Sequence, residues 1–79
     1  MDKELLKNID KIHTTKLGVE RIRRNLSLGD IDVVEFCKEK ILDENCNRCI
    51  KGKNWYREVG KIIITINRYS YTIITAHRI

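Results

Sequence analysis

The chain has 79 residues, of which 42% are hydrophobic and 34% charged, and it carries a formal net charge of +5. A chain of this length and composition has room for one hydrophobic core, so we expect a single compact domain over residues 1–79 and no disordered tail. The excess of cations favours polyanionic partners, and the longest apolar run, residues 62–64, excludes a membrane helix, which needs about 20 residues.

The first half of the chain has the apolar spacing of helices. Leu5, Leu6, Ile9 and Ile12 recur at intervals of three or four residues, which predicts a first helix over residues 2–12. His13 interrupts the pattern, and the hydroxyl of either Thr14 or Thr15 can cap a second helix. The apolar stripe of that second helix is predicted to consist of Leu17, Ile22 and Leu26.

A third helix is predicted over residues 31–42. Asp30 is a suitable N-cap for it. Its apolar positions are Val33, Val34, Cys37 and Ile41. Residues 43–48 are polar and lack periodicity, which predicts a linker to a second structural half.

The second half has the composition of strands. Residues 49–50, 54–59, 61–67 and 71–79 are rich in β-branched and aromatic residues, and Gly52 and Gly60 lie between them as turn residues. The sequence therefore predicts an α+β fold, with two to three N-terminal helices packed on one face of a three- to four-stranded antiparallel β-meander.

Strand alternation predicts which side chains share a face. In residues 61–67 we expect Ile62, Ile64 and Ile66 to face the helices. In the last strand, alternation separates one set (Tyr71, Ile73, Thr75, His77) from another (Thr72, Ile74, Ala76, Arg78). Which of these two sets meets the core depends on the turn at residues 68–70 and stays open.

Three cysteines, an odd number, and an N-terminus unlike a signal peptide favour a cytoplasmic protein. Cys46 and Cys49 form one close-set doublet, and Cys37 with His13 or His77 would complete four zinc ligands. A structural zinc site normally uses two such doublets, and Cys37 lies on the apolar face of a helix. We therefore expect no metal and no cofactor.

Residues 51–57 interleave cations with aromatic side chains around a turn, a combination that suits a phosphate backbone and a stacked base. The candidate contacts to nucleic acid or to a partner in this segment are Lys51, Lys53, Asn54, Tyr56 and Arg57. The alternative is that one of Trp55 and Tyr56 is a core residue and the lysines are merely solvated.

The C-terminal hairpin concentrates hydroxyl groups, an imidazole and arginines. We take Tyr71, Thr75 and His77 as candidate catalytic residues and Arg68 and Arg78 as further binding residues. His13 is a further candidate, because it would form an acid–base pair with His77 if the junction of the first two helices packs near the end of the sheet. The alternative is an ordinary solvent-exposed sheet face.

Four stretches, residues 5–15, 18–22, 52–56 (Gly-Lys-Asn-Trp-Tyr) and 70–77 (Ser-Tyr-Thr-Ile-Ile-Thr-Ala-His), resemble an uncharacterised family of short bacterial proteins, a domain of unknown function. More distantly, the helices and the terminal Ile-Ile-Thr-Ala-His resemble the barnase, EndoU, colicin and RelE-like ribonuclease domains. That resemblance implies an active site at Thr75 and His77, with Lys51, Lys53 and Arg57 as phosphate contacts. The sequence departs from those domains in that no second unambiguous general base and no strongly placed acid accompany His77.

Three functional hypotheses follow. The first is a small basic RNA-directed protein, metal-independent and of the ribonuclease-toxin type. The second is a non-catalytic interaction module, such as a phage or mobile-element inhibitor that binds a nucleic-acid enzyme or a nucleoprotein complex. The third is a structural partner that dimerises through an exposed strand edge. The sequence leaves open whether the protein is an enzyme and whether it is a monomer or a homodimer.

Overall fold

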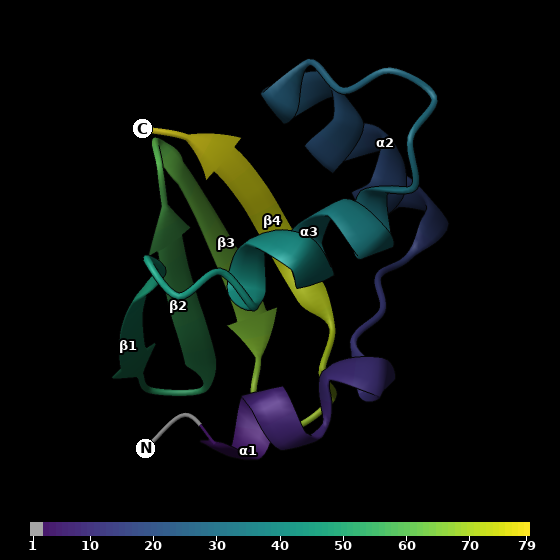
Figure 1. Ribbon diagram of the computed structural model, residues 1–79. Helices are drawn as coiled ribbons and strands as arrows, with labels where there is room; N and C mark the ends of the chain where they lie inside the picture. The colour runs from purple at the N-terminus through teal and green to yellow at the C-terminus, as the bar shows by residue number, and fades with distance from the viewer. Residues whose placement is uncertain (1–2) are drawn as a thin grey trace.

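The computed structural model describes residues 3–79, and it shows a helical half followed by a sheet (Figure 1). Asp2, at the start of the predicted first helix, lies outside the described residues. In chain order the elements are α1 (Lys3–Lys7), a 3₁₀ turn η1 (Ile9–Lys11), α2 (Lys16–Leu26), α3 (Val33–Ile41), β1 (Asn47–Lys51), β2 (Asn54–Val59), β3 (Ile62–Asn67) and β4 (Ile73–Arg78).

The four strands form one antiparallel sheet in the order β1-β2-β3-β4. Figure 1 shows α3 crossing in front of the sheet, α2 beside β4 and α1 at the lower end of the sheet. The predicted α+β fold with a β-meander is therefore confirmed. None of the helices among residues 3–79 is long and apolar enough to cross a membrane.

The first helix is much shorter than the predicted segment 2–12. At Asn8 the side-chain Nδ2 donates to the carbonyl of Glu4 at 2.8 Å, and the chain continues as the separate 3₁₀ turn. Asparagine favours such local bonds to the backbone over a continuous helix. Leu5 and Ile12, on either side of this break, are both buried, so the predicted apolar face still meets the core.

The second helix has a different buried stripe from the predicted one. Thr15 is its N-cap, and its side chain accepts from the backbone N–H of Gly18 at 3.0 Å. The buried positions are Gly18, Ile22 and Leu26, whereas Leu17 is 54% exposed. The prediction for Leu17 was wrong, because a glycine packed closely against the preceding loop takes the core-facing position.

The third helix begins later than predicted. Asp32, and not Asp30, is the N-cap, since its Oδ1 accepts from the backbone N–H of Glu35 at 3.1 Å. The predicted apolar positions Val33, Cys37 and Ile41 are buried, and Val34 is half-buried.

Two glycine turns connect the first three strands as predicted. Gly52 and Gly60 have φ of +60° and +62°, and each is the first central residue of a two-residue hairpin turn, where glycine is favoured. β2 has the predicted bounds. β1 starts two residues earlier than predicted, and β4 starts at Ile73 because Tyr71 has a positive φ of 60°.

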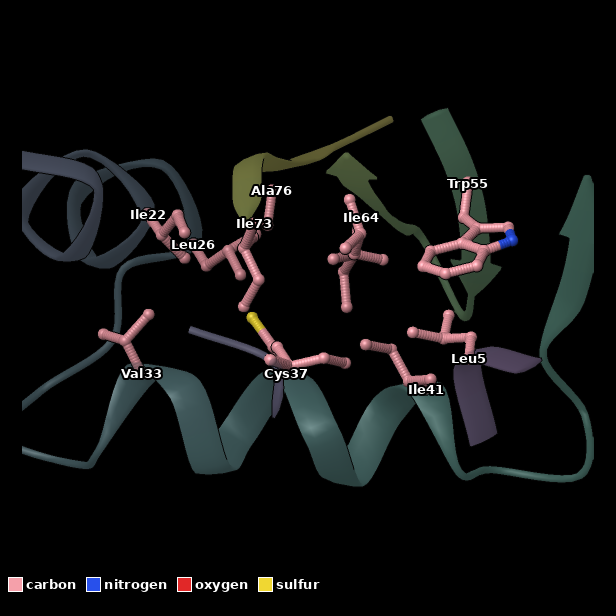
Figure 2. Packing of buried hydrophobic residues seen from close by; sticks show 12 residues of the cluster. Leu5, Ile22, Leu26, Val33, Cys37, Ile41, Trp55, Ile64, Ile73 and Ala76 are labelled. Atoms are coloured by element: carbon pink, nitrogen blue, oxygen red, sulfur yellow. The ribbon is translucent and has the colours of Figure 1, made fainter. Parts of the chain in front are cut away.

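The core lies between the sheet and the helices (Figure 2). Figure 2 shows Cys37 pointing from α3 toward Ile73 of β4, and Trp55 of β2 above Leu5 of α1. Trp55 is only 1% exposed, which confirms that one aromatic residue of the 51–57 segment belongs to the core. The predicted inward residues Ile64 and Ile66 are fully buried.

The alternation expected along the last strand is broken by a β-bulge. Thr65 pairs with Thr75, but the neighbouring Ile66 pairs with Ile73, so Ile74 is an extra residue in β4. Ile73 and Ala76 consequently both face the core, although alternation had placed them on opposite sides. Neither predicted set is correct, because an inserted residue shifts the pattern by one position.

Candidate nucleic-acid interface

The face of the sheet that points away from α1, α2 and α3 is called here the open face. The register gives three rows across it: Lys51, Asn54 and Asn67; Cys49, Tyr56, Thr65 and Thr75; and Asn47, Glu58, Ile63 and His77. Alternation places these side chains opposite Trp55, Ile64 and Ile66, which face the helices. Of the residues predicted to form a site, Lys51, Asn54, Tyr56, Thr75 and His77 therefore share one surface.

Two turns meet at one end of this face. The backbone N–H of Arg68 donates to the carbonyl of Lys53 at 2.8 Å, and Arg68 Nη1 donates to the carbonyl of Gly52 at 3.0 Å. These bonds bring Lys51, Lys53 and Arg68 to the same end of the sheet, which we call the basic end. Lys51 and Lys53 are exposed, so their ammonium groups are available to a ligand.

A chain of polar side chains lies beside the basic end. Asn67 Oδ1 accepts from Ser70 Oγ at 3.2 Å, and Ser70 Oγ lies 2.7 Å from Thr72 Oγ1. Thr72 Oγ1 lies 3.2 Å from His13 Nε2, and His13 Nδ1 lies 2.9 Å from the carbonyl of Lys11. The carbonyl of Lys11 holds the imidazole ring of His13 in one orientation. The chain of polar side chains therefore offers hydrogen-bond donors and acceptors in fixed positions to a bound ribose or base.

The sequence pointed to the C-terminal hairpin, but three members of this chain, Asn67, Ser70 and Thr72, were not among the residues selected there as candidates. Asn67 Oδ1 also accepts from two backbone N–H groups of the turn, at 2.9 and 3.0 Å. This arrangement is an Asx turn, in which the side chain of an asparagine accepts from the backbone of the residues that follow it. An asparagine before a short polar segment is the sequence signal of such a turn.

The two histidines lie far apart. His13 is bridged to Thr72. His77 lies in β4, five residues after Thr72, and at the rise of an extended strand this separates it from Thr72 by about 16 Å. The predicted acid–base pair of His13 and His77 does not form, because the junction of the first helices packs at the start of β4. No pocket is found among residues 3–79.

Three other predicted site residues lie elsewhere. Arg57 is fully buried on the side of β2 that faces the helices, so its guanidinium does not reach a surface-bound phosphate. The ring of Tyr71 packs against Trp55 with centroids 5.5 Å apart, away from Thr75 and His77. Arg78 Nη2 donates to the carbonyl of Leu26 at 2.9 Å, which ties the end of α2 to β4.

The cysteines do not gather into a cluster. Cys37 is fully buried in the core, and burial raises the pKa of its thiol to about 12, whereas Cys49 is exposed on the open face. Within residues 3–79, no group of three or more histidine, cysteine or acidic side chains is placed to hold a metal ion.

The model of a domain family described as "Protein of unknown function (DUF3781)" matches residues 6–77. The match spans nearly the whole chain and confirms the expected resemblance to an uncharacterised domain family. No curated protein and no solved structure is similar enough to count as a match.

Proposed function

The chain belongs to the DUF3781 family, whose description assigns no activity, and we propose that it binds single-stranded RNA across the open face of its sheet. In this proposal Lys51, Lys53 and Arg68 contact phosphates, and a base stacks on Tyr56. The observation that carries the proposal is the contact between the two turns, which joins three cations to one end of an uncovered sheet face.

The aromatic residue is suitably placed for stacking. Tyr56 lies in a row with Cys49, Thr65 and Thr75, which are all much smaller side chains. Its ring is half-buried and is the largest group of that row. Stacking of one base on an aromatic ring contributes about 1–3 kcal/mol, and it tolerates any base because every base has a π face.

The polar chain favours RNA over DNA as the ligand. Ser70 and Thr72 of this chain carry groups that both donate and accept hydrogen bonds, as does Asn54 on the neighbouring strand β2, and all three lie beside the basic end. The 2′-hydroxyl of RNA is itself a donor and an acceptor and is the group that distinguishes the two nucleic acids. We therefore expect a DNA oligonucleotide of the same sequence to bind less tightly.

The proposal is tested with a fluorescently labelled single-stranded RNA in an anisotropy titration. The double variant Lys51→Glu/Lys53→Glu changes the net charge from +5 to +1, because each substitution removes two units. Arg21→Glu/Arg24→Glu on α2 makes the same change at two exposed residues and is the matched control. We expect the lysine variant to bind at least about tenfold more weakly than the control, since phosphate contacts dominate affinity.

An equal loss in both double variants would mean that net charge alone attracts RNA and that the open face is not the site. The ring is tested by Tyr56→Ala against Tyr69→Ala, because Tyr69 is 73% exposed in a neighbouring turn. We expect Tyr56→Ala to weaken binding by about 5- to 150-fold, the equivalent of 1–3 kcal/mol, and Tyr69→Ala to change it little.

Cleavage of the bound RNA is the second candidate function. The observation in its favour is that Thr75 and His77 share the open face with Tyr56. In this reading His77 accepts the proton of a 2′-hydroxyl as that oxygen attacks the adjacent phosphorus. The P–O5′ bond breaks, which leaves a 2′,3′-cyclic phosphate and a 5′-oxygen that takes a proton from water. Wild type and His77→Ala are incubated with RNA in the presence of a chelator. Cleavage by wild type alone supports this function, and intact RNA in both reactions leaves binding only.

A further inference from the structure

Among residues 3–79, β1 has the one sheet edge that no other segment covers (Figure 1). The outer edge of β4 is covered, since His13 pairs with Thr72 and Thr14 Oγ1 donates to the carbonyl of Ile73 at 2.9 Å. Further along β4, Asn25 Nδ2 donates to the carbonyl of Ala76 at 3.3 Å. β1 instead pairs only with β2, and all five of its residues are exposed.

The register shows which backbone groups of β1 point outward. Lys51 and Asn54 close a two-residue hairpin, so they form a hydrogen-bonded pair, and the next such pair is Cys49 with Tyr56. The intervening residues Arg48 and Ile50 therefore direct their N–H and C=O groups away from β2. These four groups are the hydrogen-bonding template that an added strand would use.

The charge of this edge indicates its occupant. Arg48, Lys51 and Lys53 are cations, and residues 47–53 contain no acidic side chain. A second copy pairing antiparallel about Cys49 would place Arg48 opposite Ile50 and Lys51 opposite Asn47, so it would add further cations to this edge without any carboxylate to balance them. A carboxylate on the side of an incoming strand that Lys51 shares would instead lie beside a cation.

The side chain of Ile50 adds a second requirement. Ile50 pairs with Trp55 on the helix-facing side of the sheet, yet it remains 45% exposed because β1 is the outer strand. An added strand would cover it with an apolar side chain, while the next residue of that strand would lie on the same side as Lys51. We propose that β1 accepts an extended, acidic segment of a partner protein, with alternating apolar and carboxylate side chains, as a fifth strand.

The probe is a synthetic peptide of roughly ten alternating glutamate and valine residues, compared with its lysine–valine counterpart. A third peptide has the glutamate–valine sequence with alternate backbone nitrogens methylated, which removes strand donors without changing charge. The informative variant is Ile50→Pro, because proline is tolerated at an edge position whose N–H faces solvent. Ile50→Ala, which keeps the N–H, is the matched control, and circular dichroism verifies the fold of both.

We expect the glutamate–valine peptide to bind at least about tenfold more tightly than either other peptide, and Ile50→Pro to lose at least about tenfold more affinity than Ile50→Ala. On binding, the amides of Arg48 and Ile50 should gain protection from hydrogen exchange, whereas that of Cys49 is already protected. Absence of binding, or equal binding of the methylated peptide, would overturn the proposal. So would a dimer in sedimentation that Ile50→Pro abolishes, because the occupant would then be a second copy. Ile50→Pro leaves the charge unchanged, so this test is independent of RNA binding.

Discussion

Replacement of Gly18 by alanine should destabilise the protein, although alanine is the better helix former. Gly18 is buried in the first turn of α2, and a Cβ atom added there would overlap Thr14 Oγ1 and lie 3.2 Å from Thr15 Oγ1. Thr14 Oγ1 donates to the carbonyl of Ile73 at 2.9 Å. The substitution therefore disturbs the contact that ties the loop before α2 to β4.

The size of the effect follows from three contributions. The helix propensity of alanine gains about 1 kcal/mol over glycine. Displacing Thr14 leaves the Ile73 carbonyl without this donor, at a cost of about 1–3 kcal/mol, and crowding of a packed site costs about 1–3 kcal/mol more. The net loss is about 1–5 kcal/mol, which lowers the melting temperature of a domain of this size by at least about 4 °C.

Urea denaturation measures this loss, with the fluorescence of Trp55 as the signal. Trp55 is the single tryptophan and is 1% exposed, so its emission reports the opening of the core. The control is the same substitution in a Thr14→Ala background, where the overlapping hydroxyl is absent and Gly18→Ala should cost much less. An increase in stability on Gly18→Ala, or the same loss in both backgrounds, would refute the reasoning.

Three further predictions concern stability and reactivity. Burial raises the pKa of the Cys37 thiol to about 12 from its ordinary value of 9.0, so the unfolded chain loses this proton first as pH rises. Between pH 9 and 12 the free energy of unfolding of wild type, measured by urea titration at each pH, should therefore fall by roughly 1–3 kcal/mol more than that of Cys37→Ala. In the folded protein, a thiol reagent should label Cys49 but not Cys37. Ser27→Gly should raise the free energy of unfolding by about 0.5–1 kcal/mol. Ser27 ends α2 with φ of 54° and ψ of 41°, a left-handed conformation that glycine adopts more readily than serine. An unchanged denaturation midpoint would contradict this prediction. Asp32→Ala should lower the free energy of unfolding by about 1 kcal/mol and Asp30→Ala by much less, because Asp32 is the N-cap of α3. Equal losses in the two variants would contradict this assignment of the cap.

The parts of the fold that depend on local pattern could be predicted from the sequence. β2 alternates buried and partly exposed residues between two glycine turns, and its predicted bounds match the structure. α2 was located by its spacing, but its buried stripe was assigned to Leu17 in place of Gly18, because a search for apolar residues overlooks a glycine that faces the core. The bulge at Ile74 has no strong local signal, since it depends on how β4 pairs with β3.

The candidate site was less predictable, because long-range contacts assemble it. Lys51 and Lys53 were identified from their own segment, but their association with Arg68 depends on a contact between two turns. Arg57 has the composition of a phosphate contact, and only the register of β2 shows that it faces the core. The position of His13 is fixed by a parallel bridge to Thr72, which no spacing rule indicates.

The attachment of the segment before α2 to β4 also constrains how the chain folds during synthesis. His13 and Thr72, like Thr14 and Ile73, are separated by 59 residues, and β4 also completes the core against α2. Contacts of such large sequence separation slow folding. α2 therefore emerges from the ribosome with Ile22 and Leu26 still lacking their partners in β4, and they stay so until residues 73–78 have been made. The contacts of α2 with β4 consequently form only after translation has passed β4, and until then the apolar face of α2 is exposed to aggregation.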